Sequence, residues 1–96
     1  GVTVLGDGNI VNAEFTDLSR ALDDLDRAIA ECRQISEEQK LDAAAEVATM
    51  RAQIAKKHPD DKVIRIAWNA LQTVAVFDGV VGALQKVGAL IARFLS

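Results

Sequence analysis

The sequence contains few of the residues on which metal, redox and nucleophilic sites are built. It has one cysteine, one histidine and no tyrosine. A disulfide, a CxxC redox motif or a tetrahedral zinc site needs several cysteine or histidine residues, so none of these is predicted. The single thiol, Cys32, is compatible with a reducing compartment, and we expect a cytoplasmic location.

Long uncharged apolar runs and an excess of positive charge are also missing. A membrane-spanning helix needs about 18 or more apolar residues, and the nearest candidate, residues 79–95, contains Lys86 and Arg93. The formal net charge is −3. A nucleic-acid-binding protein needs a basic surface that displaces counterions, so no nucleic-acid partner is expected.

The hydrophobic residues of the chain are mostly aliphatic. Hydrophobic residues make up 50% of the 96 residues, whereas aromatic residues make up 4%. A core of Ala, Val, Leu and Ile follows, and with one proline in the chain this composition favours helices packed closely through small side chains. The length suits one domain with a modest core.

Residues 1–12 form a β-prone lead-in. Val2–Leu5 is rich in β-branched residues, and two glycines with Asp and Asn follow, which is typical of a tight turn. A phosphate-binding loop is not favoured, because the Gly-Lys-Ser/Thr ending is missing. We expect a short strand or hairpin that pairs or packs elsewhere, with its turn as a candidate interaction site. The turn residues are Gly6, Asp7, Gly8 and Asn9.

A helical seam follows the lead-in. Apolar residues recur in alternating steps of three and four, separated by charged residues, which predicts an amphipathic helix capped near Thr16. This seam is the strongest structural signal in the chain, and we expect it to face the core. Its members are Phe15, Leu18, Leu22, Leu25, Ile29 and Cys32.

A second helix is predicted from about Glu37 to Lys57. Ser36 and Gln39 form a capping box, so the preceding loop is short and the first two helices make an antiparallel hairpin. Pro59 ends the helix. Two apolar stripes run along it: an alanine-rich one that permits close approach of a partner helix, and a neighbouring one of larger residues. The first contains Leu41, Ala45, Ala48, Ala52 and Ala55, and the second contains Ala43, Val47, Met50 and Ile54.

The third helical region begins at Asp60 and is predicted to bend or break near Asp78-Gly79. Its first part is apolar around so much of its circumference that a central position in the bundle is expected. Its last part has a wide apolar face for which three interpretations stay open: core, homo-oligomer interface or membrane interface. The candidate interaction residues on this face are Val80, Val81, Leu84, Val87, Ile91 and Phe94.

No catalytic constellation is visible. His58 lies between a lysine and a proline, and Cys32 lies on an apolar seam, where a neutral buried thiol is inert. Adjacent acidic residues point in different directions on a helix and do not converge on one substrate or metal. We therefore expect no enzymatic activity and no cofactor or metal.

The lead-in from Val4 to Asn12, followed by a helical hairpin and a helix containing Trp68, resembles small helical association domains of bacterial multidomain signalling or conflict (defence) proteins. Members of this family carry a Gly-Asp-Gly-Asn-x-Val-Asn-like lead-in before a charged first helix. The resemblance implies a non-catalytic association role, by analogy.

Together these features predict an all-α bundle of three to four helices: a helical hairpin, then a long C-terminal helix that is divided in two. The predicted organisation has two parts: a lead-in of residues 1–12 and a helical domain of residues 13–96. We expect a protein-interaction or oligomerisation module, partnered by itself or by another protein. The alternative is a membrane-active domain that uses the apolar C-terminal helix.

Overall fold

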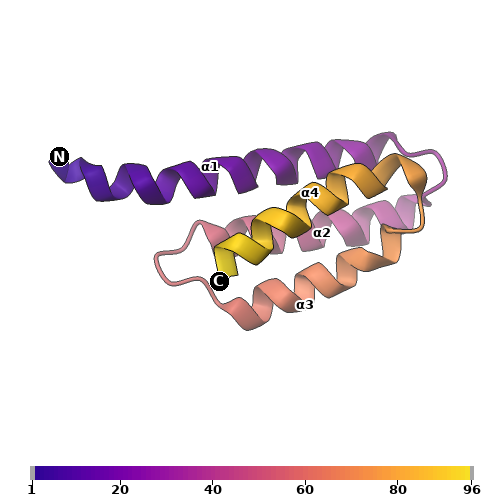
Figure 1. The fold of residues 1–96 in the computed structure, drawn as a ribbon. Helices are drawn as coiled ribbons and strands as arrows, with labels where there is room; N and C mark the ends of the chain where they lie inside the picture. The colour runs from indigo at the N-terminus through magenta and orange to yellow at the C-terminus, as the bar shows by residue number, and fades with distance from the viewer. Residues whose placement is uncertain (1, 96) are drawn as a thin grey trace.

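The computed structural model describes the backbone of residues 2–95 and the side chains of residues 15–95. Within this range the chain forms four α-helices that pack as an up-down bundle, in which α4 returns beside α1 (Figure 1). The predicted all-helical bundle is therefore confirmed, in its four-helix form. The elements are α1 (Val2–Glu31), α2 (Glu37–Ile54), α3 (Asp61–Leu71), the short 3₁₀ helix η1 (Gln72–Val74) and α4 (Asp78–Leu95).

The seam of α1 forms one wall of the core. Leu22 and Leu25 have no exposed surface, and Leu18 and Ile29 are each 1% exposed. Phe15 and Cys32, at the ends of the seam, are partly buried against the same core. Burying a leucine or isoleucine side chain contributes roughly 1.5–3 kcal/mol each. The inner position predicted for this seam is confirmed.

The start of α1 differs from the prediction. The helix begins at Val2, the strand or hairpin expected in residues 1–12 is not confirmed, and Thr16 lies inside the helix and does not cap it. A hairpin of a few residues is marginal when no other strand pairs with it, whereas each residue added to an existing helix gains one backbone hydrogen bond without a new nucleus. As a result, α1 projects beyond the other three helices (Figure 1).

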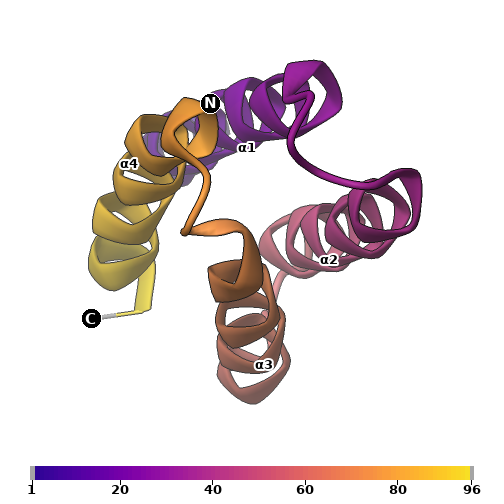
Figure 2. The same cartoon turned by 90° about the vertical axis from the view of Figure 1, so that its right-hand side faces the viewer.

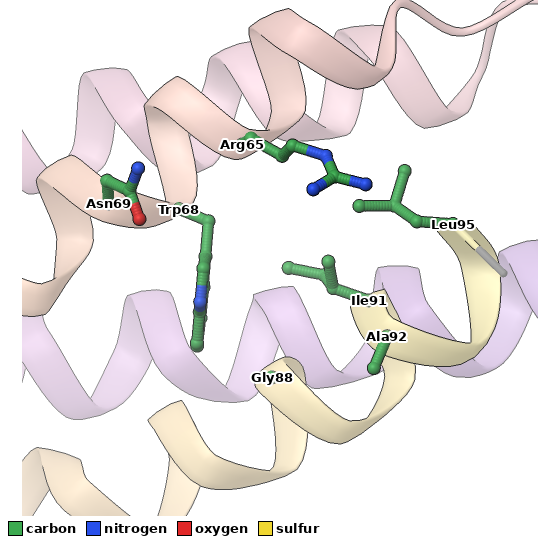
Figure 3. Close-up of a pocket in the computed structure, with 7 residues that line it drawn as sticks. All are labelled: Arg65, Trp68, Asn69, Gly88, Ile91, Ala92 and Leu95. Carbon is green, nitrogen blue, oxygen red and sulfur yellow. The ribbon is translucent and has the colours of Figure 1, made fainter.

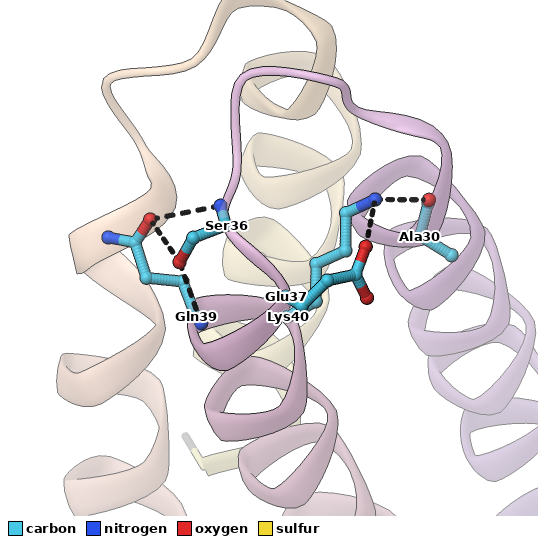
Figure 4. Close-up of polar contacts among 5 residues, drawn as sticks. All are labelled: Ala30, Ser36, Glu37, Gln39 and Lys40. Atoms are coloured by element: carbon cyan, nitrogen blue, oxygen red, sulfur yellow. Dashed lines mark hydrogen bonds and ion pairs between the residues drawn. The ribbon is translucent and has the colours of Figure 1, made fainter.

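The connection from α1 to α2 has the predicted capping box (Figure 4). The backbone N–H of Gln39 donates to Ser36 Oγ at 3.1 Å, and the N–H of Ser36 donates to Gln39 Oε1 at 3.3 Å. Lys40 Nζ donates to the carbonyl of Ala30 at 2.8 Å, which ties α2 to the end of α1. Ile35 is buried beneath this loop. The short, anchored loop holds the two helices as the expected antiparallel hairpin.

The next loop begins earlier than predicted, because α2 ends at Ile54 and not near Lys57. The side chain of Gln53 turns across the loop, where Oε1 accepts a hydrogen bond from the Asp60 N–H at 3.0 Å. Asp60 then caps α3: its carboxylate accepts from the N–H groups of Lys62 and Val63. The helix therefore ends before Pro59 is reached, and the loop is tied to the start of α3 by side chains on both sides.

The C-terminal helical region is divided, as predicted, but the break lies between Leu71 and Asp78, and Asp78 and Gly79 begin α4. In the last turn of α3, Gln72 Nε2 donates to the carbonyl of Trp68 at 3.2 Å, and Thr73 Oγ1 donates to that of Ala70 at 3.0 Å. These side chains satisfy carbonyls that a continuing helix would have used. The expectation that α3 is central is wrong, since α3 packs mainly on α2 at the edge of the bundle.

Candidate functional site

The interaction surface predicted on α4 faces the interior. Val80, Leu84, Val87 and Ile91 are at most 4% exposed and belong to the core, and Val81 and Phe94 are half-buried. Of the three interpretations of this face, the fold matches the first, a core position. At the other predicted site, the backbone of Gly6, Asp7, Gly8 and Asn9 belongs to α1, and their side chains lie outside the described residues.

The alanine-rich stripe of α2 is turned away from the bundle. All five of its residues are exposed, and the side chain of Leu41 is 72% exposed. The core is filled by the neighbouring stripe of Ala43, Val47, Met50 and Ile54. Viewed toward the helix ends, α2 stands between α1 and α3 on the periphery (Figure 2). We call the exposed stripe the α2 outer face; its residues are Leu41, Ala45, Ala48, Ala52 and Ala55.

A second large aliphatic side chain is exposed on the neighbouring helix α3. Ile66 is 63% exposed, whereas Ile64 and Ala67 on the same helix have no exposed surface. A shallow groove of about 320 Å³ runs between α2 and α3, with Ala45 and Ala70 among its lining residues. Asp42, Glu46 and Thr73 also line this groove. Ile66 precedes Ala70 by one helical turn, so it lies on the same side of α3. The third exposed aliphatic residue, Val76, is 77% exposed in the α3–α4 connection.

Charge is segregated along α2. Acidic side chains occupy its N-terminal half and basic side chains follow in its C-terminal half and just beyond, in agreement with the helix dipole. Lys40 is engaged with Glu37 and Ala30, and Arg51 is engaged with Asp23 of α1. The acidic residues are Glu37, Glu38, Asp42 and Glu46; the basic residues are Arg51 in the second half of α2 and Lys56 and Lys57 after its end.

A groove of about 440 Å³ separates α3 from the C-terminal half of α4 (Figure 3). The indole of Trp68 stands across it and reaches the backbone of Gly88, while Arg65 lies toward Leu95 at the other end. The groove combines an apolar wall with one guanidinium and one amide, which suits an apolar side chain better than a reacting substrate. Its lining residues are Arg65, Trp68, Asn69, Gly88, Ile91, Ala92 and Leu95.

The fold does not bring the sole thiol and the sole imidazole together. Cys32 follows α1 at one end of the bundle, and His58 is exposed in the α2–α3 loop at the opposite end (Figure 1). Among the described residues, no group of three or more His, Cys, Asp and Glu side chains could hold a metal ion. In the same part of the chain, no helix has both the length and the apolar character to cross a membrane.

Comparison of the chain with protein-family models, curated proteins and solved structures gives no match.

The α2 outer face was visible in the sequence as a stripe at helical period, but two such stripes were present. The signal that distinguishes them is side-chain volume, because Val47, Met50 and Ile54 fill a core that alanines would leave empty. The separation of charge along α2, with acidic residues before basic ones, is a second signal in the sequence.

Proposed function

We propose that this chain is a non-catalytic self-association module of a larger bacterial signalling or defence protein. The observation that supports the proposal is the exposure of Leu41 at the start of an alanine-lined helix face, where it also lines the groove between α1 and α2. The core is complete without these side chains, so their position outside the bundle contributes little to folding. Contiguous apolar surface on a folded domain commonly marks an interaction site.

The type of parent protein rests on the sequence. The lead-in with Gly6, Asp7, Gly8 and Asn9 resembles that of association domains in bacterial multidomain proteins, and association is the role which that resemblance implies. A cytoplasmic location belongs to the same proposal, since the single thiol suits a reducing compartment.

Light scattering coupled to size exclusion, over a series from low micromolar to near-millimolar concentration, tests the proposal. We expect a defined oligomer whose population rises with concentration. A chain that stays monomeric throughout the series contradicts the proposal. Incubation with vesicles containing anionic lipids, monitored by dye release, tests the membrane-active alternative: release by a monomeric chain would favour that alternative and overturn self-association.

A further inference from the structure

We propose that the α2 outer face binds the same face of a second copy, with the two α2 helices antiparallel. The inference rests on the proposed self-association and adds the surface and the orientation. It is carried by two independent observations: the exposed apolar residues along the helix and the distribution of charge beside them.

The apolar residues fit an antiparallel arrangement about Ala48. The five positions follow each other in steps of four and three, as in the seam of a coiled coil. When two copies are related by a two-fold axis near Ala48, Leu41 lies opposite Ala55 of the second copy, and Ala45 lies opposite Ala52. Each layer then contains at most one large side chain, and the alanines let the two helices approach closely. A two-fold axis of this kind closes the assembly as a dimer.

The charges favour the antiparallel orientation. In this register the acidic N-terminal half of α2 faces the C-terminal end of α2 in the second copy, where Lys56 and Lys57 follow the helix, and Asp42 comes near Lys56 at both ends of the interface. A parallel pair would place acid against acid and base against base. Asp42 and Lys56 are exposed and form no ion pair within the described part of the chain, so both are available to a partner. The chain is therefore electrostatically complementary to itself.

The neighbouring helix widens the contact. Two α2 helices that pack through alanines bring the flanking surfaces of both bundles together, including the α1–α2 groove of about 300 Å³ that Leu41 lines with Asp26 and Ala30 of α1. A single alanine-lined helix face offers little area, whereas a specific interface buries about 1,200–2,000 Å² in total. The position of Leu41 at this groove gives the dimer an apolar contact beside the central helix pair.

Charge reversal tests the orientation. The substitutions Asp42→Lys and Lys56→Glu each place like charges together at both ends of the antiparallel interface, and each is expected to weaken dimerisation roughly tenfold. The double variant D42K/K56E restores opposite charges and is expected to recover most of the affinity. The matched control is Ala89→Lys on the exposed side of α4, which should leave the dimer unchanged. Weakening by the single changes without recovery in the double variant would overturn the antiparallel register.

Cysteine crosslinking gives a second readout that does not depend on charge. In a Cys32→Ser background, Ala48→Cys places two thiols near the two-fold axis, and mild oxidation is expected to yield a covalent dimer. Ala55→Cys alone should crosslink poorly, but should crosslink well when mixed with Leu41→Cys. The substituted alanines and Leu41 are exposed, so each variant is expected to keep the fold. Circular dichroism measures whether it does.

The outcomes separate the two proposals. A monomer at every concentration contradicts self-association itself. A stable oligomer that forms without crosslinking at position 48, or that is indifferent to D42K and K56E, retains self-association and overturns the α2–α2 arrangement.

Discussion

The edge of the Trp68 indole lies against the backbone of Gly88. A Cβ atom at position 88 would stand 2.9 Å from Trp68 Cζ2 and 3.1 Å from Cη2, so a larger residue requires one of the two groups to move (Figure 3). Because α3 packs mainly on α2 and α4 mainly on α1, this contact joins the two pairs of helices across the groove between α3 and α4.

Replacing the glycines of α4 by alanine is expected to have different effects at two positions. Gly82→Ala meets nothing within 4 Å and should raise the free energy of unfolding by about 0.5–1 kcal/mol, since glycine is a poor helix former. Gly88→Ala should not gain this stability, because its methyl group displaces the indole. Urea titrations measure both, and a shift of tryptophan fluorescence should accompany only Gly88→Ala. Equal stabilisation with unchanged fluorescence would contradict the close contact.

The same truncation should have very different costs at two leucines. Leu22 has no exposed surface, so Leu22→Ala is expected to lower the free energy of unfolding by about 2–5 kcal/mol. Leu41 is 72% exposed, and Leu41→Ala should change the free energy of unfolding by less than about 0.5 kcal/mol in dilute solution. Chemical denaturation followed by circular dichroism is the measurement. A large loss for Leu41→Ala in the monomer would show that this side chain belongs to the core.

The capping box should stabilise the start of α2. Ser36→Ala removes the hydroxyl that accepts from the Gln39 N–H and is expected to cost about 1 kcal/mol. Ser36→Asp retains an acceptor beside the positive end of the helix dipole and serves as the matched control, with little loss expected. Thermal unfolding of the three proteins compares them, and equal losses for the two variants would refute the capping role.

The ion pair between Asp23 of α1 and Arg51 of α2 should contribute little. Both side chains are more than a third exposed, so solvent screens their attraction. Asp23→Asn is expected to lower the free energy of unfolding by less than about 1 kcal/mol, and this difference should be smaller in 1 M salt. Asp24→Asn is the control, because Asp24 is an exposed acid at the next position of α1 that points in another direction and is not in this ion pair. A large loss that persists at high salt would mean that Asp23 has a structural role beyond this pair.

Several elements of the fold could be predicted because their causes are local. The seam containing Leu18 and Leu25 is separated by charged residues, so only one face of α1 could be buried. The capping box at Ser36 depends on residues three apart. In both cases the physical cause lies within a few turns of one helix, and sequence patterns report such causes well.

The lead-in was predicted less well, because its conformation depends on its surroundings. Val2–Leu5 favours a strand only where another strand or a sheet accepts its hydrogen bonds. The described structure provides no such partner, and the backbone instead continues the helix that begins the bundle.

The sequence by itself determined that the chain is helical, where α2 and α3 are capped at their N-termini and which face of α1 is apolar. Only the tertiary structure decided which of two stripes on α2 turns inward, that α4 presents its apolar face to α1 and the core, and that Leu41 and Ile66 remain outside. Each stripe has helical period and is compatible with burial by itself. Which stripe is buried depends on whether side chains from four helices together fill one interior at native density. The sequence of one helix does not contain that information.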